Sequence, residues 1–174
     1  MAADGDFDLY FMDESGFSLT PAVPYAWQDL GRQGTIGIPS AHSKRLNYLG
    51  LLNPATHALD AFSFEGPIDS AALIGAIDEC VDALTSPAVV IADNAPTHKS
   101  KAFTEKLPDW ERRGLTFYFL SPYSPELNLI EILWRKIKYE WLPNSAYIGL
   151  DNLRLALADI FKSYGGNQYV INFS

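Results

Sequence analysis

The feature that most restricts how this 174-residue chain can fold is a short apolar run near its middle. Ala88–Ala92 reads Ala-Val-Val-Ile-Ala, without the alternation of polar and apolar residues that a half-exposed strand shows. Such a run is typical of a strand covered on both faces, as in the centre of an α/β sheet. It is followed at once by Asp93 and Asn94, so an acidic side chain is expected where this strand ends.

The spacing of apolar residues and turn formers predicts the remaining elements. The first half of the chain is predicted to hold a strand at 6–12 that stops at Asp13, a Gly- and Pro-rich loop at 18–43 with a short extended piece at 35–38, and a hairpin of strands 45–52 and 57–64 around a turn at 53–56. A helix at 68–84, capped by Asp69 or Ser70, leads to the apolar strand. After that strand come a charged helix at 99–113, a strand at 115–120 and a final helix at 150–164. Helical connections between the later strands make those strands parallel, so the prediction is a mixed α/β sheet.

Between the last strand and the last helix, residues 121–134 form a proline-punctuated turn that leads into an amphipathic helix. Each Xaa-Pro pair favours an extended backbone up to Pro125. Asn128 is the predicted N-cap, with Glu131 three residues later in the first turn, the spacing of a capping box. On the helix, one apolar stripe and one charged face are predicted: Ile130, Trp134, Ile137 and Trp141 for the stripe, and Glu131, Arg135 and Lys138 for the face.

Three acidic residues are expected to meet at one edge of the sheet. Asp13 and Asp93 each follow a strand, and the carboxyl ends of neighbouring strands are the usual site of function in an open α/β sheet. The helix after residue 128 can bring Glu131 to the same edge. Three carboxylates repel one another unless a cation joins them, and hard oxygen ligands suit Mg²⁺ or Mn²⁺. Two such ions about 4 Å apart would serve phosphodiester cleavage or exchange.

Simpler interpretations of these acids remain open. Asp13 and Asp93 are also ordinary strand-end or capping residues, and Glu131 is also a capping-box acid. Glu126 is the alternative third ligand, and Glu14 is either an auxiliary acid or a solvated neighbour.

Several blocks of the chain resemble those of DDE-type transposases of the mariner superfamily, and most closely the bacterial insertion-sequence branch, also described as DDE superfamily endonucleases. The blocks are Asp13-Glu14-Ser15, residues 93–98 (Asp-Asn-Ala-Pro-Thr-His) and residues 122–134, with weaker similarity at 27–34, at 45–50 and at the ending 169–173. One departure is Leu129, which stands where the family's third block usually has proline.

The resemblance implies a ribonuclease H-like fold, with a mixed five-stranded sheet flanked by helices and residues 1–174 as a single catalytic domain. It assigns Asp13, Asp93 and Glu131 as catalytic residues and ligands of Mg²⁺ or Mn²⁺, with two ions expected. The family's N-terminal helix-turn-helix region is absent from this sequence. The expected partners are therefore DNA (transposon ends and target), a separate helix-turn-helix polypeptide and a second copy in a homodimer.

Four further residues are expected to contact DNA. Arg135 and Lys138 share the predicted helix face of Glu131 and supply positive charge for phosphates. Asn94 either orients a water or phosphate or makes an Asx-turn. His98 either contacts phosphate, shuttles a proton, or ties its loop to the following helix.

Composition limits the partners and the compartment. The net charge is -8, which argues against a DNA-binding surface over the whole domain but allows a local basic groove. Cys80 is the single cysteine, so no intramolecular disulfide forms and a small buried residue is expected there. The sequence shows neither an apolar run of about 18 residues nor a signal peptide, so the bacterial cytosol or nucleoid is expected, without membrane contact.

Three functions are weighed. The first is a metal-dependent DNA endonuclease and strand transferase, in which a freed 3′-hydroxyl attacks target DNA after cleavage. The second is a catalytically inactive transposase remnant that binds DNA or intact transposase as a regulatory module. The third is a hydrolase of small phosphate esters, which the block at 122–134 does not suit.

Overall fold

The computed structural model of the chain describes residues 7–22, 31, 45–121, 124–166 and 168–173. The extended piece predicted at 35–38, the block at 27–34 and part of the predicted proline-rich turn lie outside these residues. The strands are β1 (Asp8–Ser18), β2 (Arg45–Asn53), β3 (Ala58–Phe64), β4 (Ala88–Ala92) and β5 (Leu115–Phe119). The helices are α1 (Ser70–Ala83), α2 (Lys101–Arg112), α3 (Ile130–Lys136) and α4 (Leu150–Ser163), with a π-helical turn at Ile137–Trp141 and 3₁₀ turns at Pro96–Lys99, Pro125–Leu127 and Asn144–Ile148.

The five strands form one mixed sheet in the order β3-β2-β1-β4-β5. The hairpin predicted at 45–64 is present, and β1, β2 and β3 are antiparallel to one another. The later strands are parallel, as the helical crossovers require: β4 pairs with β1 on one side and with β5 on the other. The predicted apolar strand Ala88–Ala92 thus lies inside the sheet, which confirms the mixed α/β architecture.

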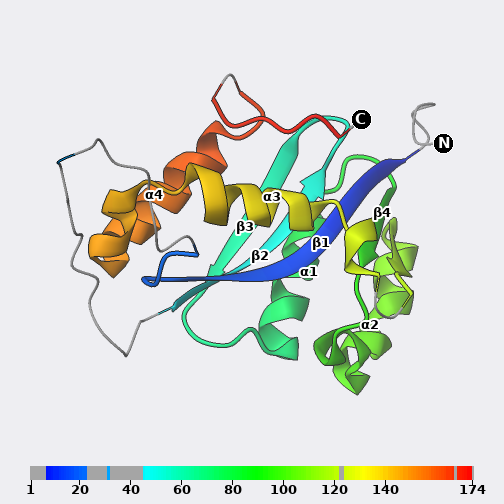
Figure 1. The fold of residues 1–174 in the computed structure, drawn as a ribbon. Helices are drawn as coiled ribbons and strands as arrows, with labels where there is room; N and C mark the ends of the chain where they lie inside the picture. Colours follow the sequence, from blue (N-terminus) through cyan, green and yellow to red (C-terminus); the bar gives the residue numbers. More distant parts are fainter. Residues whose placement is uncertain (1–6, 23–30, 32–44, 122–123, 167, 174) are drawn as a thin grey trace.

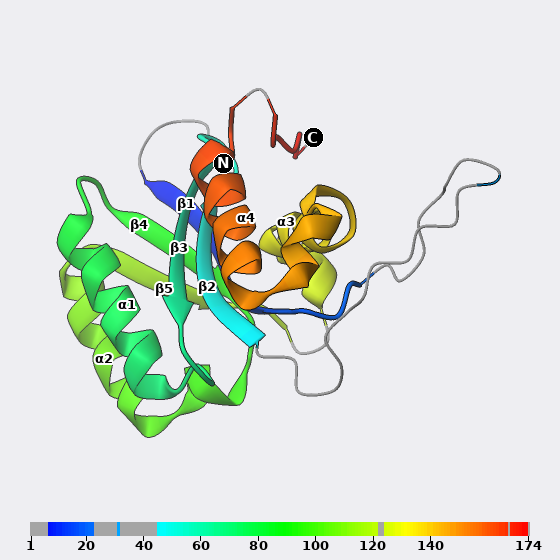
Figure 2. The ribbon, with the colours of Figure 1, turned by 90° about the vertical axis from the view of Figure 1, so that its left-hand side faces the viewer.

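Two helical layers cover the two faces of the sheet, each with its own core. Figure 2 shows α1 and α2 on one face and α3 and α4 on the other. Alternating residues of β1 divide between the cores: Met12 packs with Ile77 and Trp110 beneath α1 and α2, whereas Phe11 packs with Trp134 beneath α3 and α4. Within the described residues, no helix combines the length and apolar character needed to cross a membrane.

One predicted boundary is wrong, and it changes where Asp13 lies. The first strand does not stop before Asp13 but continues to Ser18, because its antiparallel ladder with β2 runs from Phe11 to Ser18. Asp13 is therefore held inside a strand, directly opposite Gly50. It still lies past the end of the β1–β4 pairing, whose last register pair is Phe11 with Ile91.

The predicted capping box at the start of the amphipathic helix is also wrong. α3 begins at Ile130, and its N-cap position, Leu129, makes no side-chain cap. Asn128 instead is 2% exposed, and its side-chain amide donates to the carbonyl oxygen of Met12 over 2.9 Å. A buried strand carbonyl needs a partner, and Asn128 supplies it. This bond ties the start of α3 to β1 immediately beside Asp13.

Gly50 lets α3 lie close against the sheet. A Cβ atom at this position would stand 2.6 Å from Trp134 Cζ2 and 2.8 Å from Ile130 Cδ1, closer than carbon atoms can approach. Ile130 and Trp134 belong to the predicted apolar stripe, and both are buried, as is Ile137. Figure 1 shows α3 lying across β1 and β2. Glycine within a strand often marks such a close approach.

We expect Gly50→Ala to lower the free energy of unfolding by about 1–3 kcal/mol, because the added methyl group overpacks the contact with Trp134 and Ile130. Urea unfolding measures this change. Gly75→Ala is the matched control, because nothing lies within 4 Å of a Cβ there and the residue is in a helix, so a gain of about 0.5–1 kcal/mol is expected. Equal effects of the two substitutions would contradict the close packing of α3.

Candidate active site

The acids that the sequence singles out lie near one another beyond the end of the β1–β4 pairing. Phe11 and Ile91 are opposite each other in the parallel pairing, and Asp13 and Asp93 each lie two residues further along. Asp13 lies on the face of the sheet that α3 and α4 cover, because it alternates in phase with Phe11 and Phe17. Glu131 is in the first turn of α3, next to Ile130, which packs over Gly50. Since Gly50 is the partner of Asp13, the packing of α3 brings Glu131 toward Asp13.

Mutual repulsion shows that these carboxylates lie within electrostatic reach of one another. The pKa of Asp13 is raised to about 8, first by burial and then by the negative charges of Glu131, Glu14 and Asp93, in that order. Both predicted partners of Asp13, Asp93 and Glu131, are thus among the causes. Glu126, the alternative third ligand, is exposed and is not among them.

The acids are not close enough to enclose an ion as they stand. In the part of the chain that the structure describes, no three His, Cys, Asp or Glu side chains form a group that could hold a metal ion. The donors nevertheless fit a hard cation chemically, because carboxylate oxygens suit Mg²⁺ and a half-neutralised buried acid gains from a nearby positive charge. Binding an ion would therefore require the Glu131 and Asp93 carboxylates to turn toward Asp13.

His98 lies in the interior between two acids. Its ring is 1% exposed, which leaves no surface for DNA phosphate, so the DNA contact predicted for it does not fit this position. Nδ1 lies 3.0 Å from Asp93 Oδ1 and 3.1 Å from the Asp93 carbonyl oxygen. Nε2 lies 3.3 Å from Glu14 Oε1, an ion-pair distance without the alignment of a hydrogen bond. The predicted alternative, a histidine that ties its loop in place, is what these contacts describe.

The two acids keep His98 protonated. Burial lowers the pKa of the ring, but the hydrogen bond with Asp93 and the carboxylate of Glu14 outweigh burial and raise it to about 10. The same hydrogen bond from His98 lowers the pKa of Asp93, with help from the Ala95 amide, which donates to Asp93 Oδ1 over 2.9 Å. Asp93 is therefore a fixed, charged carboxylate, unlike Asp13.

The remaining predicted DNA contacts occupy different places. Asn94 donates its side-chain amide to the carbonyl oxygen of Leu120, so it joins the ends of β4 and β5, and the Asx-turn at this point belongs to Asp93. The ammonium of Lys138 is half-buried above the ring of Phe17 and lies within electrostatic reach of Asp13 and Glu131. Arg135 is exposed in a separate shallow hollow with Ile132 and Tyr139.

The sequence did not indicate the structural roles of three residues near these acids. Gly50 admits α3, and its signal was a glycine inside an apolar strand pattern. Asn128 was noticed, but for a cap rather than for its bond to Met12. Arg45, at the start of β2, is the third. Burial is the largest cause that lowers the pKa of Lys138, and the positive charge of Arg45 is the second, so Arg45 lies within electrostatic reach of Lys138.

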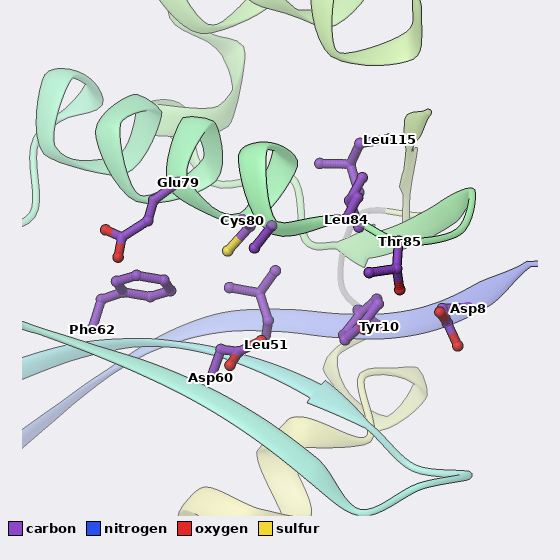
Figure 3. A pocket seen from close by; sticks show the side chains of 11 residues that line it. Asp8, Tyr10, Leu51, Asp60, Phe62, Glu79, Cys80, Leu84, Thr85 and Leu115 are labelled. Atoms are coloured by element: carbon purple, nitrogen blue, oxygen red, sulfur yellow. The ribbon is translucent and has the colours of Figure 1, made fainter. Parts of the chain in front are cut away.

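A cavity of about 200 Å³ lies beneath α1, at the end of the sheet opposite to these acids. Figure 3 shows Glu79 and Cys80 of α1 facing Phe62, Leu51 and Tyr10 of the sheet. Burial and nearby carboxylates raise the pKa of the Cys80 thiol to about 12, so it remains an unreactive thiol. The Cys80 thiol therefore does not make this cavity a site for nucleophilic catalysis.

Comparison with known proteins identifies the family. The DDE superfamily endonuclease family matches residues 8–154, and the chain belongs to this family. A curated relative, the uncharacterized protein y4pE/y4sA of Sinorhizobium fredii (strain NBRC 101917 / NGR234), is 36% identical over 66 residues, 38% of this chain and 44% of the relative.

Solved structures agree on the fold. The Mos1 transposase paired-end complex with left transposon end superposes with a TM-score of 0.63 at 14% identity, over 92% of this chain and 49% of that one. The catalytic core domain of BIV integrase gives 0.53 at 16% identity, over 95% and 91%. The fold is therefore ribonuclease H-like, as the sequence blocks implied. The chain spans about half the length of the Mos1 protein and less than half of the curated relative.

We expect Asp13→Asn to stabilise the protein at high pH. The folded-state pKa of Asp13, about 8, lies above its ordinary value of 3.8, so stability is lost as pH rises through 8 and the carboxylate ionises. In EDTA, the variant should melt within about 1 °C of the parent at pH 4 and at least about 5 °C above it at pH 9, roughly 2 kcal/mol. Asp159→Asn, at an exposed position of α4, is the control; a difference for Asp13→Asn that does not grow with pH would contradict the buried, repelled carboxylate.

His98→Phe should destabilise the fold by about 1–3 kcal/mol at pH 7, since it keeps the contacts with Phe103 and Phe119 but leaves Asp93 and Glu14 without their cation. The folded pKa of His98 is above its ordinary 6.5, so this stabilisation is complete below pH 6.5 and disappears as pH rises through about 10. Urea unfolding of both single variants and of the double variant with Asp93→Asn measures the coupling. Strictly additive losses would rule out the bridge.

Proposed function

We propose that this chain is the catalytic core of a metal-dependent DNA endonuclease and strand transferase, with Asp13, Asp93 and Glu131 as its catalytic acids. The observation that carries the proposal is the buried Asp13 carboxylate, whose pKa is raised by burial and by Glu131, Glu14 and Asp93. Natural proteins keep such repulsion mainly at functional sites, where a cation or a reaction needs it. Membership of the DDE superfamily endonuclease family supports the same reaction class.

The cation that fits these ligands is Mg²⁺ or Mn²⁺, and two ions are proposed. Solved Mos1 paired-end complexes with Mn and with Mg support the choice of metal. When bound, such ions would supply the positive charge that a phosphodiester needs for attack by water or by a 3′-hydroxyl. Asp13, Asp93 and Glu131 would hold them.

The chain's own residues divide the remaining work. His98 keeps the Asp93 carboxylate ionised through Nδ1, so this ligand would be charged before an ion binds. The Asn128–Met12 hydrogen bond fixes the start of α3, and with it Glu131, against β1. Lys138, half-buried near Asp13 and Glu131, is positioned to contact a phosphate oxygen of the substrate.

DNA is the proposed substrate and partner. The net charge of -8 keeps most of the surface unattractive to a polyanion, so the cations near the acids, Lys138 and Arg45, would concentrate binding at this edge. Complexes of Mos1 with its transposon end support DNA binding by a protein of this fold. We further propose that a helix-turn-helix segment, in another polypeptide or another part of the protein, selects the DNA sequence, and that two copies act together.

The test is plasmid nicking with Mn²⁺. The parent chain should convert supercoiled plasmid to nicked circles, and Asp93→Asn should reduce the rate at least about hundredfold, because losing a ligand exceeds the effect of losing a residue that only orients one. Asp159→Asn is the matched control and should retain full activity.

Equal rates for the parent and Asp93→Asn would refute the role of Asp93. A parent chain that binds DNA but does not nick it with either ion would instead favour the inactive regulatory module.

A further inference from the structure

A groove of about 580 Å³ adjoins the acids on the other side of β1. Glu14 and Ser15, which follow Asp13 directly, form one wall, and Thr97, which precedes His98, forms part of another. Arg45 and Asn47 of β2 complete the side nearest the start of that strand. The groove therefore shares its wall with the candidate active site, although no function has yet been assigned to it.

The sheet leaves a route between the two. β1 pairs with β4 only from Asp8 to Phe11, whereas its pairing with β2 continues to Ser18. In the described chain, the second half of β1 thus has a strand on one side only. His98 lies beside Glu14 at this edge, so a polynucleotide strand that runs from Asp13 to the groove would have to cross β1 beyond Glu14, toward Gly16 and Arg45.

Arg45 gives the groove a cation that has no acidic partner among the described residues. Among residues 7–22, 31, 45–121, 124–166 and 168–173, no carboxylate lies within ion-pair distance of its guanidinium. The side chain lies over Gly16, where a Cβ atom would stand 1.6 Å from Arg45 Nε and 2.0 Å from Cζ. The missing side chain at Gly16 is what provides this position.

The polar groups around Arg45 favour a phosphodiester over a simple anion. Glu14 lines the same groove and would repel a free anion, and His98, 3.3 Å from its carboxylate, offsets part of that charge because it also pairs with Asp93. Asn47 is fixed by donating to the carbonyl oxygen of Gly66 over 2.6 Å, and Ser15 is buried. A guanidinium at one end, with Ser15, Asn47 and Thr97 as neutral polar groups and Glu14 partly offset by His98, matches a phosphate joined to a sugar. The volume lies within the range of about 300–1,000 Å³ usual for ligand sites.

We propose that this groove binds the nucleotide next to the scissile phosphodiester, with its phosphate on Arg45. This inference rests on the proposed function and adds a second contact point for the same DNA strand, on the face of the sheet opposite α3. Arg45 is a positioning residue here, because it would hold the strand and would not touch the reacting atoms.

The experiment measures DNA binding without cleavage. Fluorescence anisotropy in EDTA compares the parent with Arg45→Ala, Gly16→Ala and the matched control Arg112→Ala, an exposed arginine of α2, on a duplex with a single-stranded extension. Arg45→Ala should weaken binding about tenfold and reduce the salt slope by about one phosphate contact. Gly16→Ala keeps the charge but displaces it, so it should weaken binding at least about threefold. Arg112→Ala should match the parent.

Neutral methylphosphonate linkages placed one at a time along the strand locate the contact. At one position near the junction, the substitution should weaken binding by the parent and leave binding by Arg45→Ala unchanged. Equal affinities and salt slopes for Arg45→Ala and Arg112→Ala, or equal losses at every methylphosphonate position, would overturn the groove as a DNA site. Failure of the proposed function is distinguishable, because the parent would then neither nick plasmid nor differ from Asp93→Asn.

Discussion

The site depends on one close packing contact, the approach of α3 to the sheet at Gly50. Ile130 and Trp134 occupy the space that a side chain at position 50 would fill. Asp13 is the register partner of Gly50, so the same contact that buries the helix brings Glu131 to the acid on β1. The hydrogen bond from Asn128 to the Met12 carbonyl oxygen holds the beginning of α3 beside Asp13. The position of α3 on the sheet, and with it the position of Glu131, thus depends on one missing side chain.

The two aspartates, Asp93 and Asp13, have opposite electrostatic environments. On one side, His98 lies between Asp93 and Glu14 and offsets part of their charge, so that Asp93 is ionised and held by a hydrogen bond. On the other, Asp13 is buried and repelled by Glu131, Glu14 and Asp93, and among the described residues no cation lies within ion-pair distance of it. Lys138 approaches, but burial and Arg45 lower its own pKa. A nearby positive charge would therefore stabilise Asp13 most, beside an Asp93 carboxylate that is already ionised.

How much of this was predictable varies with the range of the interaction. The apolar run at Ala88–Ala92 and the 45–64 hairpin are local patterns, and they predicted the central strand and the antiparallel half of the sheet. The grouping of Asp13 with Asp93 followed from parallel strands ending at one edge. The length of β1 did not follow, because it is set by its partner β2 rather than by its own residues.

Side-chain partners remote in sequence were the least predictable. Asn128 reads locally as a cap, yet a buried strand carbonyl 116 residues away takes its amide. For His98 the sequence left a phosphate contact, a proton shuttle and a loop tie open, and the structure buries the ring between Glu14 of β1 and Asp93, which follows β4. Arg135 and Lys138 share one face of a regular helix, but a π-helical turn begins at Ile137, between the two residues. Lys138 lies within electrostatic reach of Asp13 and Glu131, whereas Arg135 is exposed in a separate hollow.

The most direct test of the account is the ionisation of Asp13 itself. Carboxyl carbon NMR of the parent chain, with Asp13→Asn to assign the signal, gives its pKa with and without Mg²⁺. The account predicts a midpoint of about 8 without metal and one well below 7 in excess Mg²⁺, because the cation favours the carboxylate. A midpoint near 4 in both conditions would mean that α3 does not bring the acids together, and the proposed site would fall with it.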